Sequence, residues 1–200
     1  MEATAAALGR VDDATTLVLV EGVSDLIAVE ALARRRATDL DRQGVVVVPI
    51  GGAQAIGRFL AEFGPGGSRP RRLLGLCDAG EEAHVRRALV RAGLGPVSGR
   101  DELEALGFFV CVDDLEDELI RACGTALVEE LLEAHGDLDS FRTMQRQAAW
   151  RGRPIDRQLH RWLRAGARRH LRYSGLLLDA VAQHRFPSPL MAVLDAAVAR

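Results

Sequence analysis

Four short apolar runs, each followed by a turn and a helix-like segment, organise the first 120 residues. They lie in TLVLV (16–20), GVVVVPIGG (44–52), RRLLGLC (71–77) and GFFVCV (107–112). Apolar runs without polar alternation are typical of strands covered on both faces. Apolar stripes predict helices over 25–36, 55–63 and 82–92. Repeated strand–helix units predict an α/β fold with a mainly parallel sheet flanked by helices.

After residue 124 the pattern becomes helical throughout. TALVEELLEAHG comes first and a long arginine-rich stretch follows, before Pro187 and Pro189 precede one last short helix. We therefore expect an α/β core over 1–124 and a helical, arginine-rich C-terminal extension over 125–200 that packs on this core.

Charge is unevenly distributed along the chain. Residues 101–140 contain thirteen acids and one arginine, Arg121, whereas residues 141–173 contain ten arginines and one acid, Asp156. The sequence has no lysine, which excludes a Walker A phosphate loop, because that motif needs a lysine on the β- and γ-phosphates.

The remaining composition predicts a soluble, cytoplasmic protein. Cys77, Cys111 and Cys123 lie in apolar surroundings without metal-ligand spacing, as expected of reduced core residues. The N-terminus lacks the basic and apolar regions of a signal peptide. No apolar run is long enough to cross a membrane.

Acidic residues follow three of the predicted strands. Glu21 ends the first, and Asp25 lies one helical turn later. Ligand sites in parallel sheets gather at the carboxyl ends of strands. Two carboxylates that converge there repel each other unless a cation lies between them, which implies Mg²⁺ or Mn²⁺. The alternative is that Ser24 or Asp25 only caps the helix.

The other strand ends repeat this arrangement. Asp78 follows the third strand, and Glu81 and Glu82 begin the next helix. The fourth strand leads into DDLEDEL (113–119), whose acids are also typical of a solvated helix start. Gly51 and Gly52, after the second strand, predict either a tight turn alone or backbone amides that approach a phosphate.

These motifs resemble a known family. LVEGVSD, VVPIGG and LLGLCDAGEE resemble the Toprim domain of topoisomerases, bacterial primases and recombination proteins. FFVCVDDLEDELIRACG and FRTMQRQAAWRGRP resemble later parts of this domain in nucleases of the OLD (overcoming lysogenization defect) family. The resemblance spans about residues 14–185. It implies a Toprim-like (Rossmann-like) fold, here expected to stand alone without the ATPase domain that precedes it in that family.

The resemblance also implies site residues. By position, the metal ligands are Glu21, Asp25, Asp78, Asp114 and Glu116. Gly80 stands where the family's Asp-x-Asp motif has its second acid, so Glu81 or Glu82 would replace that ligand or support the others. The family also uses a late lysine, whose place His170 or the neighbouring Arg169 would take. The catalytic set is then Glu21, Asp78, Glu116 and His170.

The implied function is a DNA endonuclease that hydrolyses phosphodiester bonds with two Mg²⁺ or Mn²⁺ ions per site and works with a separate P-loop ATPase subunit. Arg157, Arg161, Arg164 and Arg168, at helical spacing, would hold the DNA backbone. They would equally suit covering the acidic 101–140 segment or a homodimer partner. The rival from another class is a degenerate Toprim subunit that binds or regulates without cutting. Primase-like nucleotidyl transfer is a further rival, for which the chain lacks a zinc-binding segment.

Overall fold

A parallel sheet of four strands forms the centre of the molecule, and the computed structural model describes residues 2–199. The strands lie in the order β2-β1-β3-β4. Their bounds are β1 (Thr16–Val20), β2 (Val45–Pro49), β3 (Arg72–Cys77) and β4 (Phe108–Val110). Every neighbouring pair is parallel. The α/β class and the four strands predicted from the apolar runs are confirmed.

Successive residues of each strand enter two separate cores. In β1, Leu17 and Leu19 belong to one hydrophobic cluster, and Val18 and Val20 belong to the other. All five residues of β1 are buried. Because side chains alternate between the faces of a sheet, burial on both faces requires an apolar run without alternation. This is why the sequence pattern locates the strands.

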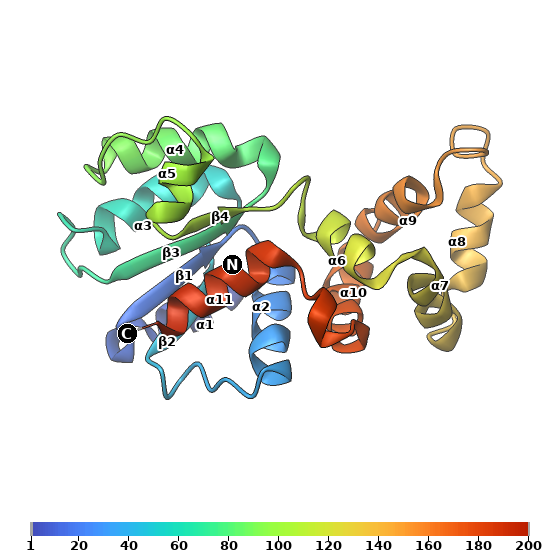
Figure 1. Cartoon of the computed structure of the whole chain (residues 1–200), viewed down its shortest axis with the longest axis horizontal. Helices are drawn as coiled ribbons and strands as arrows, with labels where there is room; N and C mark the ends of the chain where they lie inside the picture. The colour runs from blue at the N-terminus through green and yellow to red at the C-terminus, as the bar shows by residue number, and fades with distance from the viewer. Residues whose placement is uncertain (1, 200) are drawn as a thin grey trace.

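Helices cover both faces of the sheet (Figure 1). The cluster containing Leu17 is completed by α1 (Glu2–Leu8), α3 (Ile56–Phe63), α4 (Glu82–Arg91) and α5 (Arg100–Ala105). The cluster containing Val18 includes α2 (Val23–Arg35), α6 (Leu115–Cys123) and α11 (Ser188–Val198). Single 3-10 turns are η1 (Val11–Asp13), η2 (Ala53–Ala55), η3 (Ala79–Glu81) and η4 (Gln183–Arg185). No helix within residues 2–199 is long and apolar enough to span a membrane.

Five further α-helices follow α6, and the first three of them form an arm beside the sheet. The arm consists of α7 (Thr125–Ala134), α8 (Leu138–Gln145) and α9 (Ile155–Arg164), which lie away from the strands in Figure 1. The fourth helix, α10 (Ala167–Ala180), packs against α2 and α6 and so joins the arm to the core. Trp162 is buried in the arm, with its ring edge-on to Phe141 and Tyr173 at centroid distances of 6.1 and 5.7 Å.

The last helix returns to the sheet. α11 packs against β1, β3, β4 and α2, and its Leu190, Val193 and Leu194 are buried in the same cluster as Val18. The region 125–200, predicted as one extension, therefore contains an arm and a helix that covers one face of the sheet. The domain boundary at residue 124 stays a prediction.

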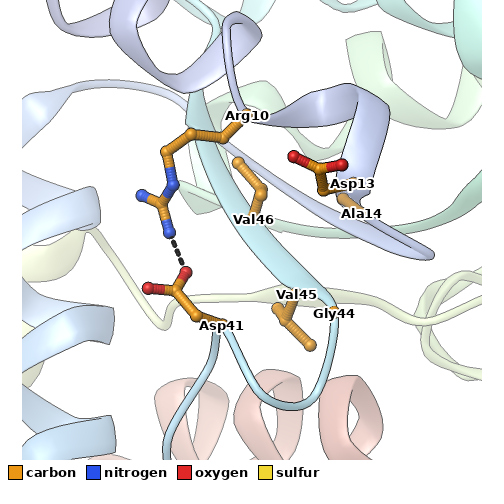
Figure 2. Close-up of a pocket in the computed structure, with 7 residues that line it drawn as sticks. All are labelled: Arg10, Asp13, Ala14, Asp41, Gly44, Val45 and Val46. Atoms are coloured by element: carbon orange, nitrogen blue, oxygen red, sulfur yellow. Dashed lines mark hydrogen bonds and ion pairs between the residues drawn. The ribbon is translucent and has the colours of Figure 1, made fainter.

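A pocket of about 260 Å³ opens near the amino ends of β1 and β2 (Figure 2). Its polar lining is Arg10, Asp13 and Asp41, and the guanidinium of Arg10 pairs with Asp41. These two side chains are 48% and 76% exposed, so water screens their charges. The pocket lies at the opposite end of the strands from the predicted acids and has no buried charged group.

Substitution of Gly75 tests the packing between β3 and β4. A Cβ atom at this position would lie 2.4 and 2.7 Å from two carbons of the buried Phe108 ring. Gly75→Ala should lower the free energy of unfolding by about 1–3 kcal/mol, because overpacking displaces neighbouring groups. Urea denaturation measures this change. The matched control is Gly80→Ala, where a Cβ meets nothing within 4 Å. An equal loss in both variants would contradict the packing argument.

Candidate functional site

The ends of β1 and β3 form the switch point of the sheet. The chain leaves β1 toward β2 on one side and leaves β3 toward β4 on the other. Ligands in open α/β folds bind at this crevice. Glu21 follows β1, and the backbone N–H of Asp78, which follows β3, donates a hydrogen bond of 2.9 Å to Glu21 Oε1. The structure therefore brings together two acids that belong to separate sequence motifs.

Asp25 lies in the first turn of α2 and is buried, with 8% of its surface exposed. The backbone N–H of Gly22 donates to Asp25 Oδ2 at 2.9 Å, the helix-start hydrogen bond of a capping box. The capping role predicted for Asp25 is thus present. The carboxyl still lies close enough to Glu21 and Glu116 for their charges to raise its pKa.

Asp114 caps the start of α6 and is almost fully paired. The Asp117 N–H donates to its Oδ1 at 3.0 Å. From α9 of the arm, His160 Nε2 lies 2.7 Å from Oδ2, and the Arg164 guanidinium binds the same oxygen. Helix α9 is therefore attached to the acidic site through Asp114.

Glu116 has a contact but no hydrogen bond at one of its oxygens. Its side chain is buried, and His170 Nδ1 of α10 lies 3.0 Å from Oε1. The geometry of this contact is not that of a hydrogen bond, so Oε1 is a buried atom without a hydrogen-bond partner in the described chain. Such atoms are uncommon in proteins and often mark a position for an ion or a water molecule.

Glu81 and Glu82 occupy different environments. Glu82 is held by Arg100 at 2.9 Å and lies 3.8 Å from Arg86, outside the group of acids. Glu81 lies 3.4 Å from the amide nitrogen of Gln54, and its charge contributes to the raised pKa of Glu21. Glu81 is therefore better placed than Glu82 to substitute for the acid that Gly80 does not supply.

Gly51 and Gly52 form the turn after β2. Both have positive φ, +82° and +101°, which favours glycine. Their backbone N–H groups both donate to the Glu21 carbonyl oxygen, at 3.1 and 2.9 Å. Space above them is open, but these amides already support the strand end that carries Glu21. The tight turn, one of the two predicted roles, is present, and the approach of a phosphate to these glycines stays a prediction.

The four arginines predicted to bind DNA do not form one helical stripe. Helix α9 ends at Arg164, and Gly166 is extended before α10 begins, so Arg168 lies on another helix. Arg157 pairs with Asp113 at 3.0 Å and Arg164 pairs with Asp114. Covering the acidic segment, the alternative role, thus occupies two of the four. Arg161 and Arg168 are exposed and form no ion pair within residues 2–199.

Two residues near the site differ from expectation. His160, which no sequence motif singled out, contacts Asp114, and its spacing of four from Arg164 is the signal that places both on one face of α9. Arg169, a candidate for the family's lysine position, contacts Trp162 and forms no ion pair with the acids within residues 2–199. Its guanidinium donates to the Trp162 carbonyl oxygen at 2.7 Å and covers the Trp162 ring.

The acids divide into two electrostatic groups. Burial, and then neighbouring carboxylates, raises the pKa of Asp78 to about 8. Burial likewise raises the pKa of Asp25 and Glu116 to about 7 each, and raises that of Glu21. Burial alone would raise the pKa of Asp114 as well. The hydrogen bonds from His160 and the Asp117 N–H, with the charge of Arg164, outweigh it and lower this pKa to about 2.

The residues suit a hard divalent cation. Carboxylate oxygens are the ligands that Mg²⁺ and Mn²⁺ prefer. The buried, unpaired Oε1 of Glu116 and the raised pKa values around it mark a deficit of positive charge. As the side chains stand, no three His, Cys, Asp or Glu residues among 2–199 converge as a metal-binding group. Glu21 and Asp25 accept from backbone amides instead, so metal binding requires their side chains to turn.

Residues 14–64 match the family model described as the overcoming lysogenization defect protein-like TOPRIM domain. The matched segment contains Glu21 and Asp25 at the end of β1. Residues 14–64 therefore carry the sequence signature of an OLD-like Toprim domain. The family resemblance of the sequence is thereby confirmed, and the buried acids lie at the strand ends of this domain. No curated protein matches the chain.

Solved structures share the fold of this Toprim domain. The C-terminal region of the OLD protein of Xanthomonas campestris pv. campestris aligns with a TM-score of 0.68 and 22% identity, covering 95% of each chain. The C-terminal region of the Burkholderia pseudomallei OLD protein aligns with a TM-score of 0.64 and 18% identity, covering 92% of this chain and 96% of that one. The alignments cover most of the chain and so extend well beyond the segment that the family model matches.

Stability without metal should depend on pH through the raised pKa values. Asp25, Asp78 and Glu116 keep protons in the folded state at pH values where the unfolded chain has lost them. The folded state then binds more protons, so the free energy of unfolding falls as pH rises from about 4 to about 8. Urea denaturation in EDTA across this range measures the fall.

Asp78→Asn removes one of these groups and should flatten the pH dependence. Asp101→Asn changes an exposed residue of α5 and serves as the control, which should follow the unmodified protein. A free energy of unfolding that increases with pH over this range, or an unchanged slope in Asp78→Asn, would contradict the assignment of buried, protonated carboxyls.

Proposed function

We propose that this OLD-like Toprim domain is a divalent-metal-dependent DNA endonuclease that hydrolyses phosphodiester bonds. The observation that carries the proposal is the group of buried and half-buried carboxyls at the ends of β1 and β3 and the start of α6, with pKa values raised to about 7 or 8 at Asp25, Asp78 and Glu116. Keeping several ionisable acids together costs stability unless a cation binds them. Toprim domains of this family are nuclease-type domains, which gives the cation a catalytic purpose.

Glu21, Asp25 and Asp78 would hold one Mg²⁺ or Mn²⁺ ion, and Asp78, Asp114 and Glu116 a second. Such ions lower the pKa of bound water and stabilise the charge of a leaving oxygen. In this assignment, Asp78 is the one ligand that belongs to both sets. Hydrogen bonds from the Asp78 and Gly22 amides hold Glu21 and Asp25 near the strand end until a cation replaces them.

His170 is the candidate for direct contact with the phosphate. Burial, and then the charge of Arg164, lowers its pKa, so the ring is neutral near pH 7. A neutral imidazole donates a hydrogen bond but supplies no fixed positive charge. Its position beside Glu116 suits orienting a phosphate oxygen at the edge of the acidic site.

DNA is the proposed substrate because α9 and α10 expose arginines to solvent. Arg161 and Arg168 have no acidic partner in the described part of the chain and are exposed. Arginines of this kind bind phosphates through charge, without reading sequence. We propose that ATP hydrolysis, where the nuclease needs it, comes from a separate P-loop ATPase, because this sequence has no lysine for such a loop.

The competing function is a Toprim subunit that binds metal or a partner without cutting. Two observations favour it: Gly80 replaces an acid of the family motif, and His160 and Arg164 already occupy Asp114. A cleavage assay separates the two functions directly.

Supercoiled plasmid incubated with the purified protein in Mg²⁺ and in Mn²⁺ should become nicked. Glu21→Ala and Asp78→Ala should reduce the nicking rate by at least about 100-fold, because each removes a proposed metal ligand. Gel electrophoresis of the plasmid forms gives the rates.

Asp101→Asn, an exposed change remote from these ligands, should leave the rate unchanged. Absence of cleavage by the unmodified protein in both metals, with and without an added ATPase subunit, would reject the nuclease and favour the binding subunit. Equal cleavage by all variants would point to a contaminating nuclease.

Arg161→Ala and Arg168→Ala should each weaken binding to a short DNA duplex. Each loss of one phosphate contact should reduce the slope of log affinity against log salt concentration by about 0.9. Fluorescence anisotropy at several salt concentrations, without divalent metal, measures both quantities. Arg142→Ala is the control, because Arg142 is paired with Glu129 at 2.8 Å. The same slope in all three variants would show that Arg161 and Arg168 do not contact DNA phosphates.

A further inference from the structure

The two groups of acids differ in how protein cations reach them. Asp114 is bound by Arg164 and His160, both from α9. Within residues 2–199, no arginine or histidine forms an ion pair with Glu21, Asp25 or Asp78. The second proposed metal position is therefore filled by side chains of the protein itself, whereas the first has no built-in cation.

Arg164 is able to leave Asp114 at small cost. Its side chain is 47% exposed, whereas that of Asp114 is 8% exposed. The carboxylate is therefore fixed in the protein, while the guanidinium already faces water and keeps much of its hydration. Leaving Asp114 therefore costs Arg164 little hydration, and the buried carboxylate is not left unpaired when a divalent cation that also binds Glu116 takes the same oxygen.

The position of Arg164 also favours movement. It is the last residue of α9, followed by Ala165 and the extended Gly166 before α10. A guanidinium released from Asp114 remains at the border of the acidic site.

We propose that Arg164 is an internal cation that occupies the second metal position until a divalent ion displaces it. This inference rests on the proposed function. Glu21, Asp25 and Asp78 would hold the first ion without displacing a protein cation. Asp78, Asp114 and Glu116 would hold the second only once Arg164 has left Asp114, and the released guanidinium would then bind a DNA phosphate. Arg164 would thus act twice, first as the cation on Asp114 and then as a ligand of the DNA phosphate.

Mn²⁺ titration followed by electron paramagnetic resonance and calorimetry tests the exchange without relying on cleavage. The unmodified protein should bind two Mn²⁺ ions with unequal affinity. Arg164→Ala should bind the second ion about fivefold more tightly, the equivalent of about 1 kcal/mol, while the first is unchanged. Arg164→Lys keeps a charge on Asp114 and should resemble the unmodified protein, which separates charge from folding defects.

Arg172→Ala is the matched control. Arg172 is also 47% exposed and pairs with a carboxylate, Asp137 at 3.1 Å, but lies outside the acidic site. Its loss should leave both Mn²⁺ affinities unchanged. Fluorescence anisotropy with a phosphorothioate duplex, which resists cleavage, supplies the second readout. Adding Mn²⁺ should strengthen DNA binding by the unmodified protein, and Arg164→Ala should lose about half of that gain or more.

The outcomes distinguish the exchange from the proposed function. Two Mn²⁺ ions bound with the same affinities by the unmodified protein and by Arg164→Ala would overturn the exchange and leave the nuclease proposal intact. No Mn²⁺ binding by either protein would overturn both. A second ion bound only by Arg164→Ala would support the exchange and show that the unmodified site does not hold two metals by itself.

Discussion

The placing of carboxyl groups together out of water is the constraint around which this molecule is arranged, because burial and then mutual repulsion disfavour their charged forms. The adjacent ends of β1 and β3, together with the start of α6, bring Glu21, Asp78 and Asp114 into one region. Backbone amides partly satisfy Glu21 and Asp25, but an amide carries no net charge. The formal positive charge comes from α9, which reaches Asp114 from the arm. The same two side chains of α9 therefore pair with Asp114 and attach the arm to the acidic site, whereas Asp78 has no ion pair among the described residues.

The sheet and its acidic edge were predictable because both follow from local sequence. A strand buried on both faces must be an unbroken apolar run, so TLVLV identifies β1 without knowledge of its neighbours. Parallel strands place their carboxyl ends at one edge, which brings Glu21 and Asp78 together once the strands are known. The ends of α2, at Val23 and Arg35, lie within two residues of the predicted ones, because the apolar stripe of a helix is also a local pattern.

What the sequence did not reveal depends on contacts between distant segments. Helical spacing predicted one stripe from Arg157 to Arg168, but the helix is interrupted at Gly166. The end of a helix has no strong local signal when proline is absent. The choice between Glu81 and Glu82 depends on Arg100, which lies 18 residues away from Glu82 in sequence. The return of α11 to the sheet is likewise decided by the apolar face that the sheet leaves uncovered, not by the sequence of α11 alone.

Helix α9 has a consequence that goes beyond its own packing. It carries Arg164 and His160 toward the acids and Arg161 toward solvent, and Leu159 and Trp162 fix it in the arm. A single rigid element thus touches two surfaces. Thermodynamic linkage requires that if occupancy of one surface changes the preferred position of this helix, ligands at the two surfaces alter each other's affinity by the same factor. A ligand that shifts α9 from the outer face of the arm would therefore also shift the cations that pair with Asp114.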